Sequence, residues 1–236
     1  MKISGLQKMT LLDYPGKVAC TVFLQGCNFR CPFCHNSDLL GGAGPEGLSV
    51  EELLAFLKKR QGLLDAVCIT GGEPTLQNDL VDLIRSIKAL GYLVKLDTNG
   101  TRPEVVKALA EEKLIDYVAM DIKNSPARYP ETAGAPHMEL GQVEQTMQLL
   151  MGGLVDYEFR TTVVEELHDA AAMQEIGQWL QKLSGGQKPK RLYLQQYMDR
   201  DTVLMGGLSA PGKEKMQEYR RILAPYAEIV ELRGVD

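Results

Sequence analysis

The sequence predicts an α/β fold built on a parallel sheet, because short apolar runs alternate with amphipathic segments along the chain. The 236 residues are enough for one sizeable core. No low-complexity tract, tandem repeat or linker divides the sequence. We therefore expect a single domain over residues 1–236, with a core at about 17–200 and a C-terminal helix and terminal strand at about 212–236.

Strands are predicted where Val, Ile, Leu and Tyr gather and polar positions are few, as in strands buried on both faces. Six such segments are 18–24, 66–70, 93–97, 117–121, 156–163 and 191–197, and 228–232 is a short terminal candidate.

Helices are predicted between these strands, at 49–60, 80–90, 103–112, 140–151, 170–183 and 213–223. Ser49 and Glu52 have the spacing of a capping box, Gly91 is a C-cap, and Pro103 stands at a first helical position. Six strand–helix units fall short of the eight in a closed TIM barrel. We expect an open, partial (βα)6 TIM-like barrel, with a doubly wound sheet as the alternative. In either fold, ligands bind at the C-terminal ends of the strands.

Charge and hydropathy exclude some classes of partner. A formal net charge of −5 argues against non-specific nucleic-acid binding. No apolar run reaches the roughly 18 residues that span a membrane, and the N-terminal segment lacks the features of a signal peptide. The sequence therefore predicts a cytoplasmic protein with no nucleic-acid or membrane partner.

Three of the five cysteines follow the first predicted strand, as Cys27-x3-Cys31-x2-Cys34. Soft thiolates at this density favour an iron–sulfur cluster or zinc. A closed site normally has four protein ligands, whereas this loop offers three thiolates. A cubane cluster on these cysteines would have one iron without a protein ligand, open to a substrate.

Three other interpretations compete with this one. Zinc could be completed by His35, although His35 directly follows Cys34 and neighbouring residues rarely both reach one tetrahedral ion. Cys20 or Cys68 could be a fourth cluster ligand, but both lie inside predicted strands, where a cysteine is more often a small buried hydrophobe. The third interpretation is three unligated thiols.

The cysteine segment resembles the signature of the radical S-adenosylmethionine (SAM) superfamily, with Phe33 directly before Cys34. Its context resembles the activating enzymes of glycyl radical enzymes, most of all those of anaerobic ribonucleoside-triphosphate reductase and then those of pyruvate formate-lyase. That context is the segments 13–16 (Asp-Tyr-Pro-Gly), 23–27 (Phe-Leu-Gln-Gly-Cys) and 34–36 (Cys-His-Asn). The resemblance covers about residues 10–200. It implies a [4Fe-4S] cluster on Cys27, Cys31 and Cys34, SAM at the open iron, and Phe33 against the adenine.

The second strand ends in Thr70-Gly71-Gly72-Glu73-Pro74. Paired glycines let the backbone approach a ligand closely, although such a turn is common after a strand. By resemblance this is the superfamily's GGEP motif, which receives the amino group of SAM. Glu73 is suited to accept a hydrogen bond from an ammonium.

Two acidic residues stand at the ends of adjacent strands, in Asp97-Thr98-Asn99-Gly100 and in Asp121-Ile122-Lys123. Adjacent strands are about 4.8 Å apart, so these carboxylates would repel unless a positive group lies between them. The resemblance implies a monovalent cation, Na⁺ or K⁺, beside SAM, with Thr98 and the carbonyl near Ala119 helping. Alternatively, the charge of Lys123 neutralises the two carboxylates in place of a cation. The simpler interpretations are an ordinary turn for the first segment and a surface salt bridge for the second.

Further predictions concern the remaining strands. Arg160 suits the carboxylate of SAM, with a strand-end salt bridge as the alternative. Residues 195–197 are candidates to line the barrel over the adenosine. We expect His137 and His168 at the surface and Trp179 in the core. The segment 124–138 is long for its position and is a candidate for a partner contact.

The resemblance implies an activase. Reductive cleavage of SAM would give a 5′-deoxyadenosyl radical, which takes hydrogen from a glycine of a partner glycyl radical enzyme, with anaerobic ribonucleotide reductase favoured. Flavodoxin or ferredoxin would supply the electron. The alternatives are a radical SAM enzyme acting on a small molecule, such as a carboxy-deazaguanine synthase-like enzyme, and a non-catalytic iron–sulfur electron carrier or zinc-stabilised module.

Overall fold

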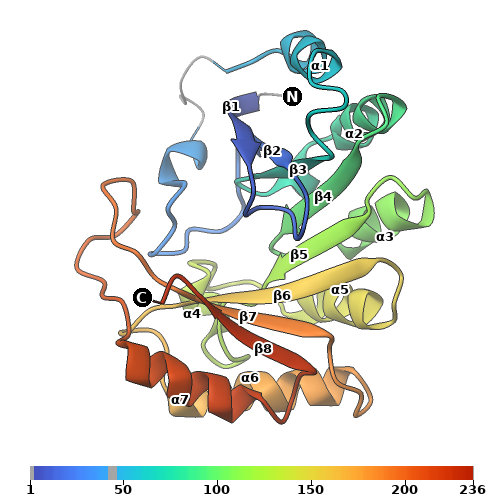
Figure 1. Ribbon diagram of the computed structural model, residues 1–236. Helices are drawn as coiled ribbons and strands as arrows, with labels where there is room; N and C mark the ends of the chain where they lie inside the picture. The colour runs from blue at the N-terminus through green and yellow to red at the C-terminus, as the bar shows by residue number, and fades with distance from the viewer. Residues whose placement is uncertain (1–2, 42–46, 236) are drawn as a thin grey trace.

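The computed structural model describes residues 3–41 and 47–235. Within these ranges, eight strands form one sheet whose spatial order follows the order of the chain (Figure 1). The strands are β1 (Ile3–Thr10), β2 (Ala19–Leu24), β3 (Ala66–Gly71), β4 (Leu93–Thr98), β5 (Tyr117–Asp121), β6 (Asp156–Val163), β7 (Arg191–Gln196) and β8 (Ile229–Arg233).

Neighbouring strands from β2 to β8 pair in parallel, and β1 is antiparallel to β2. The first and last strands do not pair with each other among the described residues, so the sheet curls without closing. The open, partial barrel is confirmed, as is the terminal strand near residue 230. β1 is an addition that the sequence did not predict.

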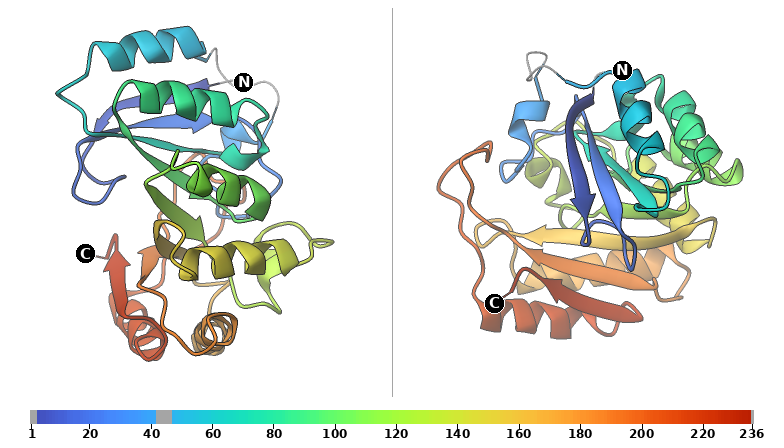
Figure 2. Two further views of the ribbon diagram at one scale, coloured as in Figure 1. Left: turned by 90° about the vertical axis from the view of Figure 1, so that its right-hand side faces the viewer. Right: turned by 45° about the horizontal axis from the view of Figure 1, so that its top comes forward.

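The helices cover the outer face of the curled sheet (Figure 2). They are α1 (Val50–Lys58), α2 (Leu80–Ala89), α3 (Pro103–Glu111), α5 (Gly141–Met151), α6 (Ala170–Leu183) and α7 (Lys213–Leu223). The short α4 (Tyr129–Thr132) lies in the loop after β5. Two 3₁₀ turns, η1 (Ser37–Leu39) and η2 (Pro74–Leu76), follow β2 and β3.

Each main helix packs one apolar stripe against the sheet. In α2 the buried residues Leu80, Leu83, Ile84 and Ile87 have the three- and four-residue spacing of a helix face. The predicted capping box of α1 is present: Ser49 and Glu52 accept hydrogen bonds from each other's backbone N–H. The apolar spacing and the capping residues in the sequence therefore agree with where the helices pack and begin.

A small apolar cluster closes the end of the barrel where the parallel strands begin. Tyr14 packs with Ala19, Ala66, Cys68 and Tyr117, and the two tyrosine ring centroids are 5.8 Å apart. The Asp-Tyr-Pro-Gly segment that contributed to the resemblance thus lies at this end. The opposite end, where the strands finish, is the end available to a ligand.

No helix in residues 3–41 and 47–235 is both long and apolar enough to cross a membrane.

Candidate active site

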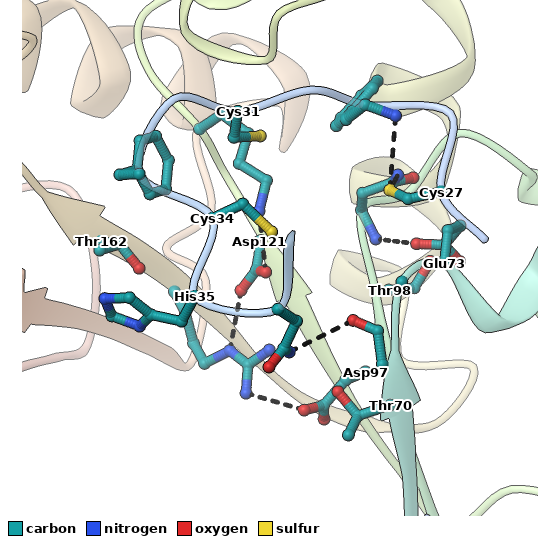
Figure 3. Close-up of a pocket in the computed structure, with 18 of the residues that line it drawn as sticks. Cys27, Cys31, Cys34, His35, Thr70, Glu73, Asp97, Thr98, Asp121 and Thr162 are labelled. Carbon is teal, nitrogen blue, oxygen red and sulfur yellow. Dashed lines mark hydrogen bonds and ion pairs between the residues drawn. The ribbon is translucent and has the colours of Figure 1, made fainter. Parts of the chain in front are cut away.

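A cavity of about 250 Å³ lies at the C-terminal ends of the strands, and strands β3 to β7 and the cysteine loop all contribute to it (Figure 3). This volume is near the lower end of ligand-binding pockets, which hold about 300–1,000 Å³. The predicted residues that do not line the cavity are Pro74, which is the first residue of η2, and Gln196 and Tyr197 of the segment 195–197. Those that line it are Cys27, Cys31, Phe33, Cys34, Gly71, Gly72, Glu73, Asp97, Thr98, Asn99, Asp121, Lys123 and Arg160.

The cysteine loop is held in one shape by backbone contacts on both sides. The N–H of Arg30 donates to the carbonyl of Ala133 at 2.9 Å, and the Arg30 guanidinium donates to the carbonyls of Cys27 and Phe29. Gly134 has φ of +60°, and a Cβ there would lie 2.1 Å from the carbonyl oxygen of Arg30. The loop after β5 therefore supports the cysteine loop through a close backbone approach that only glycine allows.

The three thiols lie on the loop that arches over Asp97 and Asp121 (Figure 3). Burial raises the pKa of Cys31 to about 11, and the nearby charge of Lys123 opposes this. Burial also raises the pKa of Cys27, while the N–H of Phe29, 3.4 Å from its sulfur, lowers it. Both a cationic side chain and an N–H donor thus favour the thiolate form that a metal would bind.

The donor set fits a three-cysteine cubane cluster. In such a cluster each cysteine binds a different iron, so the sulfurs surround the group and do not converge on one point. No three His, Cys, Asp or Glu side chains of the described segments are gathered closely enough to hold a single metal ion. Cys20 and Cys68 are buried in β2 and β3 and do not line the cavity, and burial raises the pKa of Cys20 to about 12.

The paired glycines after β3 bring this turn against the cysteine loop. A Cβ on Gly71 would lie 2.3 Å from the carbonyl oxygen of Leu24, and one on Gly72 would lie 2.0 Å from that of Gly26. The N–H of Glu73 donates to the same Gly26 carbonyl at 2.7 Å. These glycines are needed for backbone packing between two site segments, a role that the sequence pattern did not reveal.

The Glu73 carboxylate is buried, with 1% of the residue exposed, and joins two turns. It accepts hydrogen bonds from the N–H and hydroxyl of Thr75, from the hydroxyl of Thr98 at 2.9 Å and from the N–H of Asn99 at 2.6 Å. Burial raises its pKa, and these donors oppose the rise. A contact between Glu73 and the amino group of SAM stays a prediction. It would add one more donor to a carboxylate that already accepts several hydrogen bonds.

Charged side chains from neighbouring strands surround the two aspartates. Arg160 donates from Nε to Asp121 at 2.9 Å and from Nη1 to Asp97 at 3.2 Å. Lys123 donates to Asp121 at 3.0 Å, and Lys95 pairs with Asp97. Burial would raise the pKa of Asp121, but Arg160 and Lys123 outweigh it and hold this pKa at about 2.

The ion pairs bear on two of the alternatives. The salt-bridge interpretation of Arg160 is correct, and the residue also lines the cavity. Lys123 does pair with Asp121, as its alternative role required. The repulsion that favoured a cation is therefore relieved by side chains of the protein itself.

A triangle of polar side chains links the cysteine loop to the turn after β4. Asn99 donates to Asn28 at 2.8 Å, Asn28 donates to Thr101 at 3.0 Å, and Thr101 donates back to Asn99 at 2.7 Å. The sequence predicted only Asn99. Asn28 and Thr101 carry no signal that would have distinguished them from ordinary loop residues.

Other cavity residues were missed or weighed differently. Thr162 lines the cavity two positions after Arg160, and the two-residue period of a strand could have identified it. Gln195 lines it as well, whereas the amide of Gln196 donates to the carbonyl of Pro211. The remaining additions are Phe29, His35, Asn36, Leu40 and Thr70.

The prediction for His168 is wrong, because this residue is 1% exposed. Its Nδ1 accepts from the N–H of Val164 at 3.1 Å, and its Nε2 lies 2.9 Å from the carbonyl oxygen of Lys123. Burial lowers the pKa of His168, so the ring is neutral and donates through Nε2. His137 is exposed as predicted, and Trp179 is in the core.

The segment 124–138 contributes buried residues to the support of the site and also has exposed positions. Its residues Asn124, Tyr129 and Ala133 are fully buried, and Ala133 is the residue that accepts from Arg30. The hydroxyl of Tyr129 donates to the carbonyl of Asp121 at 3.2 Å. The buried residues of the segment therefore support the active site, while exposed residues such as Pro136 and His137 leave the predicted partner contact a prediction.

Residues 21–170 match the family model described as the radical SAM superfamily. A protein of Methanocaldococcus jannaschii, provisionally named a glycyl-radical enzyme activating enzyme, is 33% identical over 99% of this chain and 96% of its own length. Pyruvate formate-lyase-activating enzyme from Clostridium pasteurianum is 35% identical over 52% of each chain. A 7-carboxy-7-deazaguanine synthase from Hyperthermus butylicus is 36% identical over 50% of this chain and 48% of its own.

The crystal structure of a radical SAM methyltransferase from Sphaerobacter thermophilus has the same fold, with a TM-score of 0.73 at 15% identity. The match covers 95% of this chain and 68% of that one. The family model over residues 21–170 and the Methanocaldococcus jannaschii relative, matched over 99% of this chain, identify the chain as an enzyme of the radical SAM superfamily.

Proposed function

We propose that this protein is an activase that uses SAM to place a radical on a glycine of a partner enzyme. The observation that carries the proposal is the set of three cysteines, with no other cysteine lining the cavity, beside the strand-end motifs. The full-length similarity to the Methanocaldococcus jannaschii protein supports the activase class. The resemblance of the cysteine segment favours an anaerobic ribonucleotide reductase as the partner.

When bound, a reduced [4Fe-4S] cluster with SAM supplies a 5′-deoxyadenosyl radical. Cys27, Cys31 and Cys34 hold the cluster as thiolates. Arg160 and Lys123, both fixed by Asp121, present positive charge to the carboxylate of SAM. Because these groups are set by ion pairs before any ligand arrives, orientation requires little rearrangement.

The remaining cavity residues shape and shield the site. Phe29 and Phe33 are buried aromatic residues that line the cavity. The resemblance assigns Phe33 to the adenine of SAM. The contacts of Glu73 with Thr98 and Asn99 fix the turns after β3 and β4 relative to each other. A carbon radical reacts only with the intended C–H bond if water is kept away, and Phe29 and Phe33 contribute apolar surface to that shielding.

Three further parts of the proposal rest on the resemblance. Flavodoxin or ferredoxin donates the electron, and the protein works in the cytoplasm. A monovalent cation lies beside SAM. Since Arg160 and Lys123 already balance the two aspartates, an affinity for SAM that is equal in potassium chloride and in choline chloride would contradict the cation.

The test compares Cys27→Ala, Cys31→Ala and Cys34→Ala with the control Cys68→Ala, after anaerobic reconstitution with iron and sulfide. We expect wild type and the control to bind four irons, to give a cubane electron paramagnetic resonance signal that changes with SAM, and to cleave SAM. The three variants should lose cleavage. Iron content that falls equally in the control would favour a four-cysteine site instead.

The partner is tested by mixing the reduced enzyme and SAM with anaerobic ribonucleoside-triphosphate reductase, and separately with pyruvate formate-lyase. A doublet radical signal on either protein supports the activase. SAM cleavage without any glycyl radical, but with formation of 7-carboxy-7-deazaguanine, would favour the small-molecule alternative suggested by the similarity to the deazaguanine synthase. A cluster electron paramagnetic resonance signal that does not change when SAM is added would favour an electron carrier.

A further inference from the structure

The loop between β7 and α7 exposes apolar side chains beside the cavity. Met198, Leu204 and Met205 are 51%, 45% and 54% exposed. Single exposed apolar residues are ordinary on protein surfaces, whereas several on one segment indicate a surface that is covered in a complex. The same loop already packs Val203 and Leu208 against the core, so its outward residues are not the ones that stabilise the fold.

This loop is fixed directly to the cysteine loop. The N–H of Met205 donates to the carbonyl of Pro32 at 2.9 Å, and the hydroxyl of Ser37 donates to the carbonyl of Thr202 at 2.6 Å. The ring of His35 contacts the carbonyl of Met198 at 2.6 Å through Nε2. The loop and η1 accordingly lie side by side in Figures 1 and 2.

The far end of the loop is anchored as well. The N–H of Ser209 donates to the Glu166 carboxylate at 2.9 Å, and the carbonyl of Pro211 accepts from Gln196. Because both ends are tied to the barrel, the exposed side chains start from a pre-organised backbone. Binding to such a surface costs less ordering entropy than binding to a free loop.

The exposed residues are continuous with the cavity through two of its lining residues. His35 lines the cavity and stacks on Tyr197 with ring centroids 5.6 Å apart, and Tyr197 directly precedes Met198. Gln195, on the same strand, lines the cavity too. Met198 therefore lies next to a residue that lines the cavity.

We propose that Met198, Leu204 and Met205 form the surface on which the protein substrate docks while its glycine segment enters the cavity. The proposal rests on the proposed function and names its docking site. A backbone Cα reaches a buried reaction centre only if the parent protein binds at the rim, which a small substrate does not need. Methionine adapts to a partner surface, and the exposed Asp199, Arg200 and Asp201 give the apolar centre a polar rim.

The test is the triple variant Met198→Ser, Leu204→Ser, Met205→Ser. Met198 and Met205 contribute backbone atoms, a carbonyl and an N–H, to the hydrogen bonds that tie them to His35 and Pro32, so the substitutions keep these groups. The matched control is Leu11→Ser, Leu12→Ser, since both are exposed apolar residues at the opposite end of the barrel, after β1 and before β2.

Two readouts separate docking from chemistry. The first is SAM cleavage driven by dithionite, or by flavodoxin, without a protein substrate. The second is the yield of glycyl radical against the concentration of anaerobic ribonucleoside-triphosphate reductase, or of pyruvate formate-lyase if that is the one activated. We expect both forms of cleavage to be unchanged in the triple variant, and the KM for the protein substrate to rise by about tenfold or more. The control should match wild type.

An unchanged KM in the triple variant would overturn the proposal. Loss of flavodoxin-driven cleavage, with dithionite-driven cleavage kept, would also overturn it, because the surface would then belong to the electron donor. A wild-type enzyme that makes no glycyl radical on either protein would refute the proposed function itself, an outcome visible before any variant is compared.

Discussion

The backbone N–H of Asn99 donates to the carboxylate of Glu73 across 2.6 Å. These residues follow different strands, and the contact fixes the ends of β3 and β4 to each other. Through the Asn28–Asn99–Thr101 triangle the same turn also contacts the cysteine loop. Glu73 is thus a positioning residue for three of the segments that line the cavity.

Replacement of Glu73 by Gln should destabilise the fold and weaken SAM binding. One carboxylate oxygen becomes an NH₂ group, and in either orientation this group faces a backbone N–H, of Thr75 or of Asn99, which can only donate. A buried donor left without a partner costs about 1–3 kcal/mol in the free energy of unfolding. Urea denaturation and calorimetric titration with SAM measure the two effects. Glu52→Gln, at the exposed N-terminus of α1, is the control, and an equal effect of both changes would show that Glu73 is an ordinary carboxylate.

The bridge from Arg160 to Asp97 and Asp121 predicts a second outcome. Arg160→Met leaves two mostly buried carboxylates short of one cation, and breaking a buried pair costs about 3–5 kcal/mol. The pKa of Asp121 should rise from about 2, since the Arg160 charge helps to hold it there. We expect lower stability and at least tenfold weaker SAM binding.

Arg160→Lys should recover little of this loss, because one ammonium does not reproduce the two-point contact of the guanidinium. Arg85→Met removes an exposed pair with Glu112 and serves as the control, with an expected loss of about 0–1 kcal/mol. Full SAM affinity in Arg160→Met would mean that Lys123 and Lys95 suffice.

The buried His168 predicts a pH dependence of stability. Burial lowers its pKa from the ordinary value of 6.5, so the unfolded chain binds a proton more readily than the folded one. The free energy of unfolding should therefore fall as the pH drops below about 6.5, by up to about 1.4 kcal/mol per pH unit for this proton. Urea denaturation at pH values from 7.5 to 5 measures the slope.

His168→Gln should remove that slope, while His137→Gln, at an exposed position, should keep it. The amide of glutamine still offers a donor to the carbonyl of Lys123 and an acceptor to Val164. A slope that survives in His168→Gln would assign the effect to other groups.

Gly134 predicts a steric effect on the cysteine loop. In Gly134→Ala the new Cβ would meet the carbonyl of Arg30, so the loop must shift. Iron content after reconstitution and the thermal midpoint should both fall. Gly153→Ala is the control, because Gly153 also has positive φ, at +81°, but nothing lies within 4 Å of its Cβ position. Equal losses in both variants would attribute the effect to backbone strain alone.

Much of this arrangement was predictable because it follows from local pattern. Buried parallel strands are continuous apolar runs, and residues that follow such strands gather at one edge of a sheet. This reasoning placed Cys27, Gly71, Asp97 and Asp121 around a single cavity, as the structure shows. β1 was not predicted because its exposed positions, including Gln7 and Lys8, interrupt the apolar run that is typical of a buried strand.

The features of the site that the sequence did not predict depend on strand register and on backbone contacts. Asp121 lies directly opposite Arg160 in the β5–β6 pairing, and nothing in either segment specifies that alignment. The support of Arg30 by Ala133 uses only main-chain atoms, which leave no side-chain signature beyond the nearby Gly134. His168 was placed at the surface because its loop is polar, while its partners are the backbone groups of Val164 and Lys123.

The order of the sheet has a consequence for how the protein is made. The spatial order of the strands is the order of synthesis, and the cysteine loop is made early, between β2 and β3. Its supporting contacts come from much later segments, at Ala133, Thr202 and Met205. The nascent chain therefore presents three cysteines before it has a framework to hold them. Insertion of the cluster is in this way coupled to completion of nearly the whole chain, and a truncated product has no finished site to fill.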